Sequence, residues 1–158
     1  MIPAMKKNSR IENMLAGLDA TPSGGGVGYD PRYTGWFKCF NAQDYYEAHD
    51  VLEHLWLRTR DENHAFFKGL IQVAGAFVHL RKQFERPWHP KDSTRLRPAV
   101  RLFEIGGRNL APYGPFHLRL NVATVCTLCE TLAASITGSG FLRNPWNPDN
   151  SPRIELAG

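Results

Sequence analysis

The chain has 158 residues, a length that fits one domain with a hydrophobic core of its own. Hydrophobic residues make up 42% and charged residues 22%, and no apolar run reaches the roughly 18 residues of a transmembrane helix, which argues against a membrane-spanning protein. Three cysteines argue against a disulfide framework, and the N-terminus lacks an apolar signal core, so we expect a cytoplasmic protein with no membrane partner.

Residues 1–29 predict a flexible N-terminal arm. A short helix predicted over residues 11–18 precedes TPSGGGVG, which has the composition of a turn or linker. No Lys-Ser or Lys-Thr follows the glycines, which disfavours a phosphate-binding loop. Asp30 and Pro31 then predict the start of a short helix that continues to about Phe40, with Asp30 as its cap.

Residues 42–59 contain no Gly or Pro and predict a long amphipathic helix. Asn41 and Asp44 fit its cap and first turn. His49 falls inside the apolar stripe and Glu53 at its edge, so the imidazole and the carboxylate can meet at a spacing of four residues. Three further polar residues are predicted on the opposite side of this helix: Glu47, Asp50 and His54.

Residues 62–84 predict a second long helix, capped by Asp61 and stopped by Pro87. Two apolar rows cover much of its circumference, so we expect it to be largely buried. Gly69 and Gly75 disfavour helix, which suggests close backbone approach or access to a pocket. One polar row remains: Lys68, Gln72, Gly75, His79 and Lys82.

Two more helices are expected, over about 92–110, with its regular part from near Arg97 because of Pro98, and over about 121–136. We predict an all-α fold: one antiparallel bundle of four main helices plus a short preceding helix, spanning residues 30–138.

Residues 139–158 predict an extended tail. The tail has three apolar residues that could clamp onto the body or onto a neighbour: Phe141, Leu142 and Trp146. No strand is expected. In the loop 86–92, we interpret Trp88 and His89 as covering the core rather than as the rim of a pocket.

Two separate motifs, in order, resemble the domain of unknown function family 309. They are Phe40-Asn41, Tyr46-Glu47-Ala48-His49-Asp50, Glu53 and Trp56, followed by Phe67-Lys68-Gly69-Leu70-Ile71-Gln72-Val73-Ala74. The resemblance covers roughly Tyr33 to Ile136. It implies a small all-helical domain, in a family with no established activity. The family usually carries Glu where this chain has Asp50.

The polar residues of the two long helices form the candidate site. Antiparallel packing could bring His49 and Glu53 to the row that contains Gln72 and His79. Three interpretations stay open: a hydrogen-bonded structural network, a pocket for a small ligand or anion, and a metal or enzyme site. His49, Glu53 and His79 would be the ligands of a divalent metal such as zinc, although the Glu-x-x-His pattern of helical-bundle metal sites is absent. The full candidate set is Glu47, His49, Asp50, Glu53, Trp56, Lys68, Gln72 and His79.

Charge is divided along the chain, with −4 over residues 41–62 and +5 over residues 81–108. These segments can pair within the fold, across a homo-oligomer or with an outside anion. Cys126 and Cys129 form a CxxC inside a helical pattern, which favours buried apolar residues over a redox pair. We expect a non-catalytic, homo-oligomeric helical domain that recognises a protein partner or small ligand; the alternative is a metal-binding protein or metal-dependent enzyme. Nucleic acid is the least favoured partner.

Overall fold

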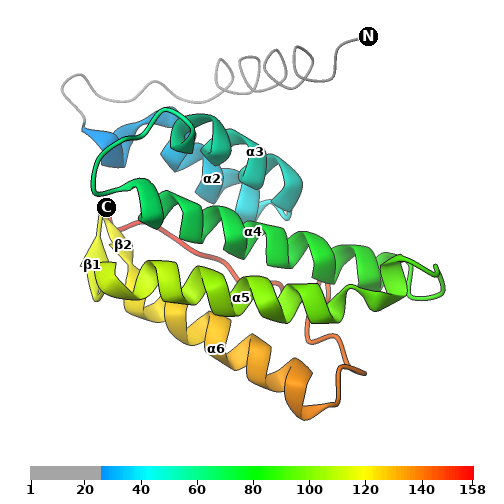
Figure 1. Cartoon of the computed structure of the whole chain (residues 1–158). Helices are drawn as coiled ribbons and strands as arrows, with labels where there is room; N and C mark the ends of the chain where they lie inside the picture. The colour runs from blue at the N-terminus through cyan, green and yellow to red at the C-terminus, as the bar shows by residue number, and fades with distance from the viewer. Residues whose placement is uncertain (1–25) are drawn as a thin grey trace, which may run out of the picture.

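This computed structural model describes residues 26–158, which contain five α-helices, three short 3-10 helices and one short hairpin. Successive α-helices run antiparallel, and α4 lies between the α2–α3 pair and the α5–α6 pair (Figure 1). This arrangement confirms the predicted all-α bundle. The elements are η1 (Val27–Tyr29), α2 (Pro31–Asn41), α3 (Tyr45–Trp56), α4 (His64–Glu85), η2 (Asp92–Thr94), α5 (Leu96–Leu110), η3 (Ala111–Tyr113), β1 (Phe116–His117), β2 (Leu120–Asn121) and α6 (Val122–Gly138).

The junction between α2 and α3 differs from the prediction. Asp30 caps α2 as expected, because its side chain accepts a hydrogen bond of 2.8 Å from the backbone N–H of Arg32. However, α2 continues to Asn41 and α3 begins only at Tyr45. Gln43 between them has a φ of 64°, a left-handed conformation that ends a helix. The predicted cap at Asn41 is therefore wrong, and Asp44 occupies the cap position without a side-chain hydrogen bond.

Helices α4 and α5 approach each other closely at two glycines. A Cβ atom placed on Gly69 would lie 2.7 Å from Cγ of Leu110 and 3.1 Å from the carbonyl oxygen of Gly106. The same construction on Gly106 reaches the carbonyl oxygen of Gly69 at 3.1 Å. Contacts this short leave no room for a side chain, so Gly69 serves close backbone approach, one of the two roles that the sequence suggested.

The side of α4 that faces α2 and α3 is packed with aromatic rings. The Phe77 ring lies 4.9 Å from that of Phe40 and 5.1 Å from that of Tyr45, and it also meets Phe103 of α5 at 5.4 Å. Tilted and edge-to-face arrangements dominate, as the ring quadrupoles favour. Seven aromatic residues of α2, α3 and α4 are essentially inaccessible to solvent: Tyr33, Trp36, Phe40, Tyr45, Phe66, Phe67 and Phe77.

Residues 139–158 contain no helix or strand and lie along the bundle, which agrees with the extended tail that we predicted. Trp146 is 4% exposed, and its indole N–H donates to the hydroxyl of Tyr45 at 3.0 Å. The Asn41 side chain bonds both backbone groups of Ile154, at 2.9 and 2.8 Å. Leu142 is 86% exposed, so it is not part of the clamp that we expected.

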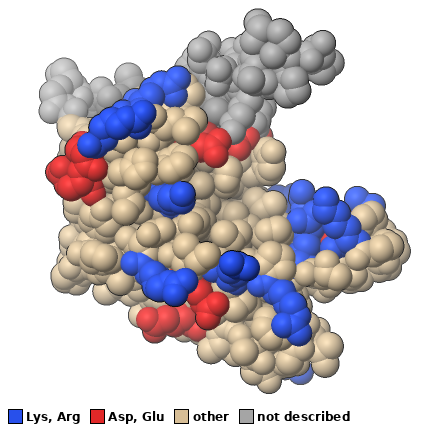
Figure 2. All heavy atoms as spheres, viewed as in Figure 1, with Lys and Arg blue, Asp and Glu red and all other residues tan. Residues whose placement is uncertain are grey.

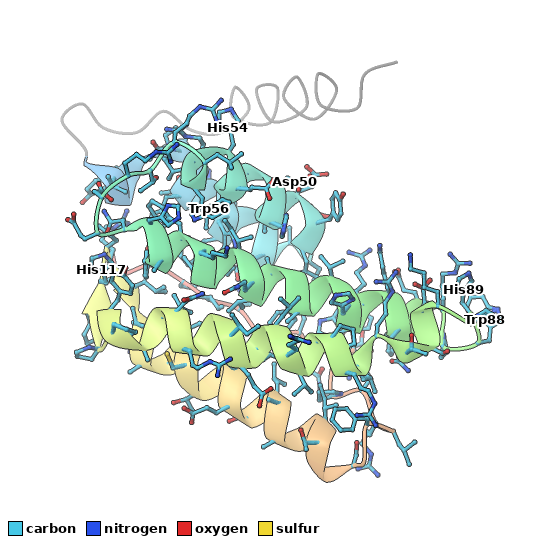
Figure 3. The ribbon with its side chains drawn as sticks, viewed as in Figure 1. Asp50, His54, Trp56, Trp88, His89 and His117 are labelled. Atoms are coloured by element: carbon cyan, nitrogen blue, oxygen red, sulfur yellow. The ribbon has the colours of Figure 1, made fainter. Side chains whose placement is uncertain are left out.

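Two further features between helices differ from the predictions. The antiparallel pair β1–β2 was not expected; its turn residues Leu118 and Arg119 have φ of 45° and 66° and lack the Gly or Asn that usually announces such a turn. Trp88 was expected to cover the core but is 70% exposed, because the loop 86–92 extends beyond the bundle (Figure 3). The helix predicted over residues 11–18 lies outside the described residues. None of the helices described here has the length and apolar character needed to cross a membrane.

Candidate functional site

Three side chains of α3 that can bind a metal ion converge on consecutive turns. One ligand atom from each of His49, Asp50 and Glu53 lies within 4.8 Å of the other two. His49 Nδ1 and Asp50 Oδ1 are 3.1 Å apart, a hydrogen bond that orients the imidazole ring. The meeting of His49 with Glu53 that their spacing of four residues predicted is therefore present, and Asp50 joins them.

Asp50 is buried, although we predicted it on the side of the helix opposite the core. Its residue is 2% exposed, whereas the side chain of His49 is 32% exposed. Because α3 packs against both α2 and α4, a wider arc of its surface is covered than a single apolar stripe implies. A buried carboxylate needs hydrogen bonds or a positive charge to offset its lost hydration, and the bond with His49 supplies one of these.

The imidazole of His49 lies beside the backbone of α4. A Cβ atom on Gly75 would lie 3.9 Å from Cδ2 of His49 and 3.2 Å from Cδ1 of Leu102. The ring of Tyr46 stacks beside His49 at 6.4 Å, with 23° between the ring planes. Gly75 therefore borders the histidine ring at the α3–α4 surface, at a distance that would also accept a methyl group.

Gln72 and His79 of the polar row of α4 bond toward the α5 side, where we expected them to meet α3. Asn109 donates to the side-chain oxygen of Gln72 at 2.7 Å, and Arg95 donates to Nδ1 of His79 at 3.0 Å. Burial, aided by the charges of Arg95 and Lys82, lowers the pKa of His79 to about 4. His79 is thus a neutral acceptor, and the structure does not bring it into the group of His49, Asp50 and Glu53.

The three remaining candidates, Trp56, Lys68 and Glu47, lie in two separate places. Lys68 Nζ lies 4.8 Å from the ring centre of Trp56, whose ring also meets that of His64 at 5.0 Å. The indole N–H of Trp56 is buried without a hydrogen-bond partner among the described residues. Glu47 lines a different groove of about 330 Å³, together with Arg81 and other residues near the end of α4. The eight candidates therefore do not form one network.

Arg95 and Asn109 contact the predicted site and were not among the candidates. Sequence periodicity places a residue on a face of its own helix, but it does not give the rotation of one helix relative to the next. The polar character of both residues was visible in the sequence, yet no signal paired them with His79 or Gln72.

The three cysteines are poor nucleophiles near neutral pH. Burial raises the pKa of Cys39 to about 11 and that of Cys129 to about 12, with smaller contributions from nearby acids and, for Cys129, from the Cys126 thiol. The same cause raises the pKa of Cys126, whose thiol donates to the carbonyl oxygen of Gly107 at 3.8 Å. All three cysteines are free, and two of them lie within α6. This arrangement fits structural thiols.

Residues 34–93 match the model of a protein family described as Domain of unknown function (DUF309). No curated protein and no solved structure matches the chain. The matched segment holds all eight candidate residues, while Arg95 and Asn109 lie beyond it. The match confirms the resemblance that the sequence motifs indicated. Over residues 34–93, the chain is similar to the DUF309 family.

Proposed function

We propose that this protein is a non-catalytic helical domain that binds a small ligand, and that the ligand is a divalent metal ion held by His49, Asp50 and Glu53. One observation carries the proposal: an imidazole and two carboxylates lie within 4.8 Å of one another on α3. The metal set differs from the one that the sequence suggested, because Asp50 takes the place of His79.

The chemistry of these three groups suits a transition ion such as zinc or manganese. Imidazole nitrogen and carboxylate oxygen are ligands that both ions accept. The buried carboxylate of Asp50 supports the assignment, because a bound cation would offset its desolvation. Three protein ligands also leave coordination positions for water or for a small anion.

The non-catalytic part of the proposal rests on the groups that an enzyme would use. The raised pKa values of Cys39, Cys126 and Cys129 keep these thiols protonated near neutral pH. His79 already accepts a hydrogen bond from Arg95. Its pKa of about 4 leaves it unprotonated at neutral pH, so it has no proton to donate in catalysis there. The alternative, a metal-dependent enzyme, would use the same three ligands.

Metal content tests the proposal directly. We would purify the untagged protein, measure bound metals, and titrate metal-free protein with zinc and manganese in a calorimeter. We expect about one ion per chain in the wild type, and strongly weakened binding in His49→Ala and Glu53→Gln. Glu47→Gln is the matched control, because Glu47 is an acid of the same helix outside the group.

Two outcomes would count against metal binding. The first is the absence of bound metal and of any titration signal in the wild type. The second is equal weakening by Glu53→Gln and Glu47→Gln, which would indicate a general charge effect. If metal binds, a hydrolase screen of the metal-loaded protein then separates the non-catalytic domain from the enzyme.

Homo-oligomerisation remains a prediction, and one observation on α6 favours it. The exposed residues of this helix are small and uncharged except for Glu130, so a second copy could pack there without the cost of desolvating several charges. Light scattering after size-exclusion chromatography measures the mass: we expect a dimer or larger, and dissociation in Thr127→Glu. A monomer at all concentrations would contradict this prediction.

The cytoplasmic location is likewise a prediction, which fractionation of cells would test.

A further inference from the structure

The last turn of α4 and the connection to α5 form a protruding tip, which we define as residues 81–95. It extends past the ends of the neighbouring helices, with Trp88 and His89 at its far end (Figures 1 and 3). Trp88 is 70% exposed, and Pro87 and Pro90 beside it are also exposed. Arg86 and Lys91 flank this short apolar apex on its two sides. The tip therefore presents an aromatic ring to the outside, between two positive charges.

The acids of the tip are already paired, which leaves a positive surface. Glu85 bonds Arg81 at 3.2 Å, and the buried Asp92 accepts from Arg95 at 2.5 Å and lies 3.6 Å from Arg86. The tip holds five bases against these two acids. Figure 2 shows Lys and Arg atoms gathered over this end of the molecule. Lys82 and Lys91 have no acidic partner among the described residues.

Local hydrogen bonds and two prolines hold the tip in one shape. Nδ1 of His89 accepts from the backbone N–H groups of Lys91 and Asp92, at 3.1 and 3.2 Å. The backbone N–H of Ser93 donates to the carbonyl oxygen of His89 at 2.9 Å. Proline fixes φ on either side of Trp88 and His89. Binding through such a preorganised tip costs little conformational entropy.

We propose that this tip docks the protein onto an anionic lipid surface. The Trp88 ring would lie among the lipid headgroups, a position that tryptophan prefers, while the surrounding lysines and arginines contact lipid phosphates. The convex shape favours a lipid surface over single-stranded nucleic acid. Single-stranded nucleic acid is usually bound along a groove with several stacking rings, whereas this surface is a protrusion with one ring and two prolines. Docking of this kind is peripheral and needs no spanning helix.

Vesicle flotation tests the proposal with the full-length protein. We expect it to float with vesicles of phosphatidylcholine and phosphatidylglycerol, and not with phosphatidylcholine alone. Trp88→Ala should reduce binding at least about tenfold, since it removes the apolar anchor. Leu142→Ala is the matched control, because Leu142 is an exposed apolar residue outside the tip. The other three tryptophans are buried or half-buried, so a blue shift of fluorescence on binding would report Trp88.

A second pair of variants tests the charge. Lys82→Ala/Lys91→Ala should weaken binding about 25-fold, at about fivefold for each base near the surface. Arg101→Ala/Arg108→Ala, which removes two exposed bases of α5, should have little effect. Binding should also fall as salt rises, because screening shortens the reach of these charges. The proposal is overturned if the wild type does not bind anionic vesicles at low salt, if both double variants bind equally, or if Trp88→Ala instead abolishes tight binding to single-stranded DNA.

Discussion

Helix α4 packs against its two sets of neighbours by opposite means. Toward α2 and α3 it presents aromatic rings, with Phe77 in contact with both Phe40 and Tyr45. Toward α5 it has no side chain at the closest point, because Gly69 meets Gly106 backbone to backbone. The first interface is filled by large side chains, whereas around Gly69 and Gly106 the second is closed by the absence of side chains; farther along α4, Phe77 also reaches Phe103 of α5. The first should therefore be sensitive to lost volume, and the second to added volume.

The largest expected effect is on the aromatic side. Phe77→Ala removes a fully buried ring that contacts three others, so we expect the free energy of unfolding to fall by about 3–5 kcal/mol. Urea unfolding followed by circular dichroism would measure it. Phe84→Ala on the same helix is the control, since Phe84 is 43% exposed and should cost much less. Equal losses in the two variants would mean that the ring cluster does not carry the stability assigned to it.

At the contact between α4 and α5, the expected loss of stability comes from added volume instead of lost volume. Gly69→Ala places a methyl group 2.7 Å from Leu110 and 3.1 Å from the backbone of α5, so we expect a loss of about 1–3 kcal/mol despite the better helix propensity of alanine. Gly75→Ala meets only the end of Leu102 and the edge of His49, and it should be near neutral. Thermal unfolding of both variants makes the comparison. Similar melting temperatures would contradict a close crossing at Gly69.

A smaller effect concerns pH. The pKa of His79 is about 4 in the folded protein, against an ordinary value of 6.5. Between these values the unfolded chain binds a proton that the folded chain does not, so this residue makes unfolding easier as the pH falls from about 6.5 to 4. Above that window it has no effect. His79→Gln should flatten the pH dependence of the unfolding free energy there. An unchanged slope would contradict the protected, neutral state, and His64→Gln in the exposed first turn of α4 is the control.

Periodicity and helix-stop residues predicted the main helices, because each apolar stripe repeats over several turns and three of the four end at Pro or Gly. The start of α3 was missed because Gln43 adopts a left-handed conformation that glutamine rarely takes. The hairpin was missed for the same reason at Leu118 and Arg119. In both places tertiary packing overrides the backbone preference of the residue, and the residue types give no signal of the left-handed conformation.

The candidate site was predicted in part. His49 and Glu53 lie together because their spacing on one helix ensures it. The partners of Gln72 and His79 could not be predicted, since they depend on how α5 is rotated against α4. The burial of Asp50 could not be predicted either, because α3 packs against two helices and a single helical wheel does not contain the second.

The bonds between Asn41 and Ile154 join residues that are 113 positions apart in the chain. Such a contact closes a long loop, whose entropy cost precedes any gain from the contact itself. We therefore expect the tail to dock late in folding, after the helices have assembled. The same order in reverse makes it the first segment to open, so its backbone amides, including that of Ile154, should exchange with solvent hydrogen well before those of α4. Local opening of the molecule would then begin at its C-terminal tail, before any helix of the bundle opens.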